Sequence, residues 1–177
     1  MPDSLPEAAP TQTTTALCQT LAEKLQARGW MMATAESCTG GLIAGACTDL
    51  SGSSNWFERG FVTYSNAAKT ELLGVDATLI NTHGAVSEIV ARAMAEGALR
   101  HSHAQVSVAV TGVAGPTGGS ADKPVGTVWF GWCVAGHTTT GLRCFDGDRA
   151  AVRAQTVAHA LARLAALLDT AGRPSPA

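Results

Sequence analysis

The chain has 177 residues, of which 46% are hydrophobic and 15% are charged, and these values are typical of one compact domain and exclude a disordered chain. Twelve Lys and Arg against fourteen Asp and Glu give a net charge of −2, which argues against a nucleic-acid-binding or membrane-surface protein, because either would need a basic face. The five cysteines include no Cys-x-x-Cys pair and favour a reducing compartment, so we expect a cytoplasmic protein.

The two ends of the chain differ from its middle. Residues 1–12 and 171–177 are rich in Pro and Ala, and we expect flexible ends around one domain over residues 13–170. The N-terminus has no basic stretch followed by an apolar core, which argues against a signal peptide. No uninterrupted apolar run approaches the roughly 20 residues of a membrane span, so we expect no membrane association.

Hydrophobic spacing predicts the elements in chain order. Leu17, Leu21 and Leu25 repeat at helical spacing, and Gly29 ends that first helix. The patterns that follow predict a strand over 30–35, a helix over 40–50, a strand over 57–65, short and long helices over 66–73 and 86–102, a strand over 105–111, a hairpin over 125–135 and 138–145, and a final helix over 148–169. This order predicts an α/β fold: a single three-layer α/β/α domain with a mixed, mostly parallel sheet.

The segment Thr34–Gly41, TAESCTGG, is the part of the chain best suited to carry chemistry. It follows a strand and precedes a helix, so it places Ser37 near N–H groups that a helix leaves unpaired. Those groups and the helix dipole favour an anion, which makes Ser37 a candidate nucleophile and the N–H groups around Thr39, Gly40 and Gly41 candidate oxyanion donors. The same pattern also fits a helix N-cap without chemistry.

Two later strand ends carry further polar residues. The strand that ends at Asn66 contains Tyr64 and is followed by Lys69, while the strand over 105–111 runs through Thr111 and Gly112 into a glycine-rich loop. Loops at the carboxyl ends of strands in an open α/β sheet gather where ligands bind. We therefore expect the three strand-end segments that carry these Ser, Tyr, Lys, Thr and Gly residues to face one cleft.

Several other residues admit two interpretations. Cys38 neighbours Ser37 and is a rival nucleophile, although a buried structural thiol is favoured. Glu36 either orients Lys69 or hydrogen-bonds the turn, and the sequence does not choose. His101 and His103 do not share a helix face, no zinc-binding motif is present, and a surface pair without metal is expected.

The loop over 112–119 and the start of the last helix are candidate phosphate sites. The loop lacks the Gly-Lys-Ser/Thr ending of a P-loop, but its N–H groups can still contact a ligand. Arg149 follows the expected N-cap Asp148, where a guanidinium suits a nucleotide phosphate, and it is equally compatible with a solvated side chain. Arg143 and Arg153 are the rivals for this role.

Five segments in order carry a family resemblance: AESCTGG at 35–41, GFVTYSN at 60–66 with Lys69 beyond it, GAVSE at 84–88, TGVAGP at 111–116 and KPVGT at 123–127. Together they resemble the CinA C-terminal domain family, the nicotinamide-nucleotide amidohydrolases, from about Thr13 to about Leu168. The resemblance implies deamidation of nicotinamide mononucleotide (NMN) to nicotinate mononucleotide and ammonia by a serine and lysine pair, with no cofactor and no metal.

In the chemistry that this resemblance implies, Ser37 attacks the carboxamide carbon and neutral Lys69 takes its proton. Since a free lysine has a pKa of about 10.4, Lys69 must be partly buried or lie beside a cation. Tyr64 is expected to hydrogen-bond Ser37 or Lys69 and relay a proton to ammonia. Asn66, Thr111, Gly112 and Arg149, with the turn over 39–41, are expected to bind substrate. The alternative is a non-catalytic nucleotide-sensing or protein-partner domain linked to competence or DNA damage, and the sequence leaves a homo-oligomer open.

Overall fold

The computed structural model describes residues 12–171, so most of the two expected flexible ends, residues 1–11 and 172–177, lies outside the described part. Its elements are helix α1 (Thr14–Gln26), strand β1 (Met32–Glu36), helix α2 (Leu42–Thr48), the 3₁₀ turn η1 (Ser53–Asn55), strand β2 (Phe57–Val62), helices α3 (Asn66–Leu73), α4 (Ala77–His83) and α5 (Glu88–Arg100), strands β3 (Val106–Gly112), β4 (Thr127–Val134) and β5 (His137–Cys144), and helix α6 (Arg149–Thr170). Among residues 12–171, no helix combines the length and the apolar character that a membrane crossing requires.

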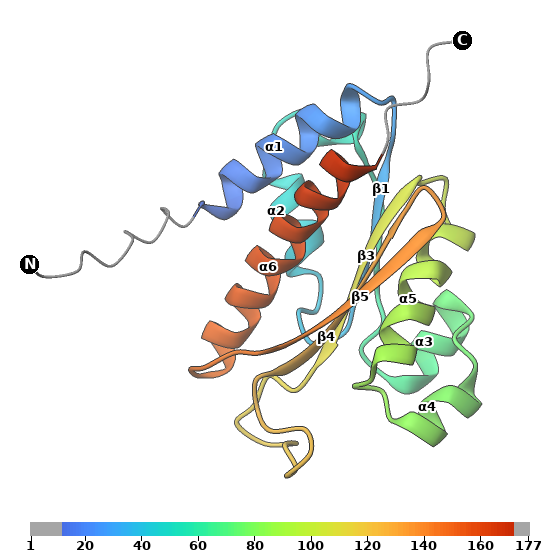
Figure 1. Ribbon diagram of the computed structural model, residues 1–177, viewed down its shortest axis with the longest axis vertical. Coiled ribbons are helices and arrows are strands. Elements are labelled where there is room, and N and C mark those ends of the chain that lie inside the picture. The colour runs from blue at the N-terminus through green and yellow to red at the C-terminus, as the bar shows by residue number, and fades with distance from the viewer. Residues whose placement is uncertain (1–11, 172–177) are drawn as a thin grey trace, which may run out of the picture.

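The strands form one mixed sheet in the order β2-β1-β3-β4-β5. Strand β1 pairs in parallel with both β2 and β3, whereas β4 pairs antiparallel with both β3 and β5. It follows that β4 alone runs against the other strands. Helices α1, α2 and α6 cover one face, and α3, α4 and α5 cover the other (Figure 1). The predicted three-layer α/β/α domain with a mixed sheet is confirmed.

The two faces of the sheet are packed with side chains of different size. On the α6 side the buried cluster contains large residues such as Trp132, Phe130 and Leu161. On the α5 side the sheet contributes small residues, among them Ala35 and Ala109. The helices on that second face therefore approach the sheet closely, because little side-chain volume separates them from its backbone.

Side-chain alternation along β1 decides what its last residues reach. Successive side chains of a strand point to opposite faces, so Met32 packs in the α6-side cluster and Ala33 in the α5-side cluster. The alternation continues past the strand end. The Glu36 carboxylate meets the backbone of α2, and the Ser37 hydroxyl meets Lys69 of α3. One strand thus directs a carboxylate and a hydroxyl into different layers.

Close packing in the α5 layer rests on a glycine. A Cβ atom added at Gly97 would collide with the carbonyl oxygen of Leu73, at the end of α3. We expect Gly97→Ala to lower the free energy of unfolding by about 2 kcal/mol, because overpacking outweighs the roughly 1 kcal/mol by which alanine favours a helix. Urea unfolding measures this. The matched variant Gly45→Ala, where the added Cβ meets open space in α2, should instead be stabilising. Equal effects of the two substitutions would contradict this packing argument.

Several features of the fold differ from the sequence prediction. Helix α2 covers Leu42–Thr48 instead of 40–50, and strand β2 ends at Val62, before Tyr64 and Asn66. Helix α4 was not predicted, because it has only seven residues and few apolar positions, although its N-cap Asp76 accepts a hydrogen bond from the Thr78 N–H at 2.8 Å. The helix predicted over 86–102 begins only at Glu88. The residues before it, including Val86, instead line a cavity described below.

Candidate active site

A cavity of about 260 Å³ lies at the carboxyl ends of β1 and β3. It contains seven of the predicted site residues, namely Ser37, Tyr64, Asn66, Lys69, Thr111, Gly112 and Arg149. The remaining lining residues are Cys38, Ala85, Val86 and Ala114. A larger cavity of about 570 Å³ lies elsewhere, against Trp30, Val134 and Leu167, and contains none of the predicted residues. The chemistry of its lining, and not its size, makes the smaller cavity the candidate site.

The centre of this cavity is a contact between Lys69 and Ser37. Lys69 Nζ lies 3.0 Å from Ser37 Oγ, 2.8 Å from the carbonyl oxygen of Thr63 and 3.4 Å from that of Tyr64. The lysine is 1% exposed and the serine 8% exposed. Burial disfavours the charged amine and lowers the pKa of Lys69 to about 8. Lys69 therefore loses its proton at a lower pH than an exposed lysine does.

Lys69 Nζ donates all three of its hydrogen bonds, one to Ser37 Oγ and two to backbone carbonyl oxygens. A neutral amine has two N–H donors and one lone pair, whereas the ammonium has three donors and none. The Thr63 and Tyr64 carbonyls accept the two N–H groups. In the ammonium the third N–H points to Ser37 Oγ, whereas in the neutral amine the lone pair is directed at that oxygen.

Local structure fixes both partners. Ser65 is the N-cap of α3, where its hydroxyl accepts a hydrogen bond from the Ala68 N–H at 3.0 Å, and the helix that starts there carries Lys69. On the other side, the Ser37 N–H donates to the carbonyl oxygen of Val110 in β3 at 3.1 Å. Ser37 is thereby attached to a buried strand, and Lys69 to a capped helix.

Glu36 hydrogen-bonds the turn and does not contact Lys69. It is 1% exposed, and its carboxylate accepts from the N–H groups of Ile43 and Ala44 at 2.8 and 3.0 Å and from the Thr39 hydroxyl at 2.6 Å. The Glu36 carboxylate thus accepts hydrogen bonds from N–H groups that the first turn of α2 would otherwise leave unpaired. The N–H groups of that turn are occupied and are not free for an oxyanion.

The predicted oxyanion donors need one correction. The Gly40 N–H donates to the Ser37 carbonyl oxygen at 3.0 Å, so Gly40 is not a free donor. Thr39, Gly40 and Gly41 are also absent from the cavity lining. Within residues 12–171, the N–H groups of Cys38, Thr39 and Gly41 make no hydrogen bond to another residue. Of these three residues Cys38 lines the cavity, and for Thr39 and Gly41 a role in oxyanion or substrate binding stays a prediction.

The Tyr64 side chain lies at the rim of the cavity and does not contact the side chains of Ser37 and Lys69. Its side chain is 63% exposed, and its hydroxyl accepts a hydrogen bond from Arg149 Nη2 at 3.3 Å. Only its carbonyl oxygen meets Lys69. The expected hydrogen bond from the Tyr64 hydroxyl to Ser37 or Lys69 is therefore not formed.

Of the three arginines considered for phosphate binding, only Arg149 lines the cavity. It is the first residue of α6 and also donates to the Gly115 carbonyl oxygen at 2.9 Å. Arg143 donates only to the neighbouring Leu142 carbonyl, and Arg153 donates to the carbonyl oxygens of Cys38 and Thr39. The geometry leaves Arg149 as the phosphate candidate.

The remaining lining residues shape the wall of the cavity. Thr111 is buried, and its hydroxyl donates to the Ala85 carbonyl oxygen at 2.9 Å, while Asn66 is exposed at the start of α3. Ala85 and Val86 were not among the predicted site residues. Their signal in the sequence was the GAVSE segment at 84–88, which precedes the helix instead of belonging to it.

Cys38 lines the cavity, but its environment does not suit a nucleophile. The side chain is buried, as expected, and burial raises the pKa of the thiol to about 11. A thiol with that pKa is protonated at neutral pH, and the thiolate is the reactive form. Of the two neighbouring candidates, Ser37 is the one whose side chain hydrogen-bonds Lys69.

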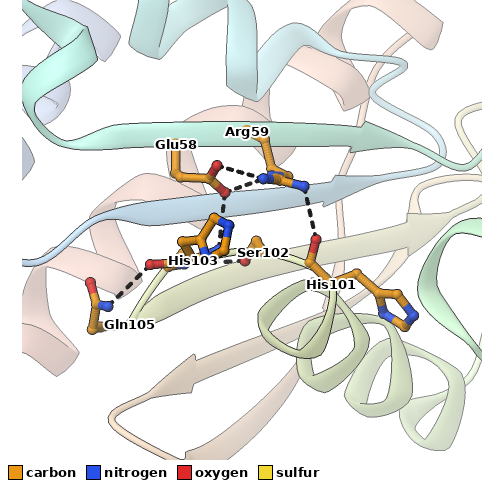
Figure 2. A network of polar contacts seen from close by, with 7 residues as sticks. Glu58, Arg59, His101, Ser102, His103 and Gln105 are labelled. Atoms are coloured by element: carbon orange, nitrogen blue, oxygen red, sulfur yellow. Dashed lines mark hydrogen bonds and ion pairs between the residues drawn. The ribbon is translucent and has the colours of Figure 1, made fainter.

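The two surface histidines belong to a network far from the cavity. Figure 2 shows Glu58 and Arg59 of β2 in contact with the loop between α5 and β3. Glu58 accepts from the His103 N–H at 3.3 Å, and Arg59 donates to the His101 carbonyl oxygen at 3.1 Å. A register shift in the pairing with β1 leaves Glu58 unpaired, which lets it meet Arg59. In residues 12–171 no group of three or more His, Cys, Asp or Glu could hold a metal ion.

A family model, two named relatives and one solved structure each match most of this chain. The family model described as CinA C-terminal domain matches residues 14–168. A protein of Enterobacter agglomerans named nicotinamide-nucleotide amidohydrolase PncC is 58% identical over 138 residues, which are 77% of this chain and 84% of that protein. A protein of the same name from Escherichia coli strain K12 is 53% identical over 149 residues, 84% of this chain and 90% of its own length. The crystal structure of competence damage-inducible protein A (ComA) from Klebsiella pneumoniae matches with a TM-score of 0.88 and 41% identity, over 91% of this chain and 100% of that chain.

Proposed function

The chain belongs to the CinA C-terminal domain family, and on that premise we propose that it hydrolyses the amide of nicotinamide mononucleotide through a serine–lysine pair. Relatives that are 58% and 53% identical are named nicotinamide-nucleotide amidohydrolases, which supports the substrate and the reaction. The observation that carries the mechanism is the buried contact of 3.0 Å between Lys69 Nζ and Ser37 Oγ inside the cavity.

In the proposed reaction Ser37 Oγ attacks the carboxamide carbon while Lys69 accepts the hydroxyl proton. The resulting ammonium has a third N–H, which points to the oxygen of Ser37, while the Thr63 and Tyr64 carbonyls keep the other two. The N–H groups of Cys38 and Thr39 stabilise the oxyanion. Lys69 then protonates the leaving nitrogen, ammonia departs, and a nicotinoyl ester of Ser37 remains.

Water completes the cycle. Lys69, neutral again after ammonia has taken the proton, removes a proton from the attacking water, and the second tetrahedral intermediate collapses with return of the proton to Ser37 Oγ. The product is nicotinate mononucleotide. The scheme needs a nucleophile, a base and oxyanion donors, all of which this chain supplies, and it uses no metal and no cofactor.

Arg149 is the residue that we propose for the phosphate of the substrate. It is exposed at the cavity rim, and a guanidinium binds phosphate oxygens by charge-assisted hydrogen bonds. This guanidinium donates one hydrogen bond to the Tyr64 hydroxyl and one to the Gly115 carbonyl oxygen. We also propose a cytoplasmic location, because all five cysteines are free thiols, which suits a reducing compartment.

The test of the proposed function is direct. Purified protein incubated with NMN should release ammonia and nicotinate mononucleotide in equal amounts, and a Ser37→Ala preparation purified identically should release neither above background. Free nicotinamide should be a poorer substrate, since it lacks the phosphate. Absence of turnover by the unchanged protein, with NMN still bound, would point instead to a nucleotide-sensing domain.

The pH dependence of kcat/KM should follow the titration of Lys69. The base acts in its neutral form, so activity rises with pH through the lowered pKa of about 8 and is level above it. An unburied lysine would give the same rise only near about pH 10.4. Initial rates measured in buffers of constant ionic strength locate the midpoint. A profile with no rise between pH 6 and 9 would contradict the role of Lys69 as base.

A further inference from the structure

Arg153 contacts the nucleophile turn from the side opposite to Lys69. It lies one turn after Arg149 in α6 and donates from Nε to the Cys38 carbonyl oxygen at 3.2 Å and from Nη2 to the Thr39 carbonyl oxygen at 3.1 Å. The side chain is half-buried and does not line the cavity. One planar guanidinium therefore holds two consecutive peptide groups of the turn that carries Ser37.

These two bonds determine where the N–H groups of the turn point. In a trans peptide the N–H and the C=O point in opposite directions. The peptide that offers the Cys38 carbonyl to Arg153 consequently directs the Thr39 N–H away from α6. Helix α6 lies on one face of the sheet and α3, which carries Lys69, on the other (Figure 1). The Thr39 N–H is thus turned towards the side on which Ser37 meets its base.

The next peptide group, between Thr39 and Gly40, is held by Arg153 in the same way. Its carbonyl, that of Thr39, also accepts from Arg153, and its N–H, that of Gly40, donates to the Ser37 carbonyl oxygen at 3.0 Å. Both peptides are therefore fixed, one with its N–H used inside the turn and one with its N–H unoccupied within residues 12–171. A fixed and unoccupied donor beside a nucleophile is what an oxyanion hole consists of.

We infer that Arg153 is a positioning residue that forms the oxyanion hole by fixing the Cys38–Thr39 peptide, an inference that rests on the proposed amidase function. Its charge adds to the effect, because a charged donor on a carbonyl polarises the peptide and strengthens its N–H as a donor. A lysine cannot replace it, since a single ammonium does not present two donors in a rigid fork.

The decisive variant is Arg153→Lys, which keeps the charge and removes the fork. We expect kcat for NMN to fall by about 10²-fold, the range reported for the loss of one oxyanion donor, while KM stays within about threefold. The matched control is Arg163→Lys, because Arg163 is exposed on the same helix. It should leave kcat unchanged. Melting temperatures of both variants verify that each is folded.

A second measurement separates positioning from a structural role. Pyridine-3-boronic acid can form a tetrahedral adduct with Ser37 in which one boron-bound oxygen occupies the oxyanion position. Its inhibition constant should rise about 10²-fold in Arg153→Lys, in parallel with the loss of kcat, because the adduct resembles the transition state. If Arg153→Lys is poorly folded, Arg153→Ala with added ethylguanidinium provides the same test, and partial recovery of kcat is expected.

The outcomes are distinguishable. Wild-type kcat in Arg153→Lys, or a lower kcat with unchanged boronate inhibition, overturns the inference and leaves the amidase function intact. A large rise in KM with unchanged kcat also overturns it and makes Arg153 a substrate-binding residue. Absence of NMN hydrolysis by the unchanged protein refutes the proposed function itself, and no comparison of variants is then needed.

Discussion

Replacing Ser37 with alanine should lower kcat for NMN by on the order of 10³-fold or more, and Lys69→Met should lower it to a similar extent. Without Ser37 Oγ no acyl-enzyme forms, and without Lys69 Nζ, 3.0 Å away, the hydroxyl keeps its proton. Methionine matches the lysine side chain as far as Cε and lacks only Nζ, so it leaves little empty space at this buried position. Ammonia release at saturating NMN measures the effect.

The double variant Ser37→Ala/Lys69→Met tests whether the two residues act as one catalytic unit. Its kcat should be little lower than that of either single variant, because residues of one catalytic unit are strongly non-additive. Lys24→Met is the matched control, since Lys24 pairs with Asp169 on the surface and should leave kcat unchanged. Losses that multiply in the double variant would mean that Lys69 binds substrate instead of acting as the base. Activity that survives Ser37→Ala and disappears in Cys38→Ser would move the nucleophile by one residue.

Glu36→Gln should have the largest effect on stability, a decrease of about 3 kcal/mol in the free energy of unfolding. The buried carboxylate of Glu36 accepts from two N–H groups of α2 and from the Thr39 hydroxyl. An amide of the same size replaces one acceptor oxygen with an N–H₂ group, so at least one buried donor loses its partner. Urea unfolding measures the change.

The control for this variant is Glu23→Gln, an exposed position of α1, which should change the free energy of unfolding by no more than about 0.5 kcal/mol. The kcat of Glu36→Gln should fall as well, because the carboxylate also fixes the turn that holds Ser37. A stability equal to that of the unchanged protein would mean that the first turn of α2 does not depend on this side chain.

That Ser37 and Lys69 face one cleft could be predicted from strand order and strand ends, whereas their direct pairing was implied by the family resemblance. Parallel strands bring their carboxyl ends to one edge of the sheet, whatever the exact element boundaries are. The role of Glu36 could not be predicted in this way. It depends on where α2 begins, which is Leu42 in the structure, after Gly41 in a left-handed conformation with φ 103°. A start two residues earlier would have presented different N–H groups to the carboxylate.

The separation of Arg149 from Arg153 was equally beyond the sequence. The two lie four residues apart on the same helix face, so the pattern predicts the same surroundings for both. The N-cap Asp148, which accepts from the Ala151 N–H at 2.9 Å, sets the start of α6. One helical turn then separates an arginine at the cavity rim from one behind the nucleophile turn. Three-dimensional placement, and not residue type, divides their roles.

The unequal size of the side chains on the two faces of the sheet has a consequence for how such a protein can diverge. The layer that holds α6 is filled by bulky groups such as Trp132 and Phe130, so truncation there leaves voids. The layer that holds α3 and α5 is lined by Ala35 and Ala109, where enlargement pushes helices outward and would draw Lys69 away from Ser37. Neutral drift is therefore constrained in opposite directions: a saturation library should be depleted of small residues in one layer and of large residues in the other. Selection for activity, in addition to stability, should strengthen only the depletion of large residues in the layer that holds α3 and α5.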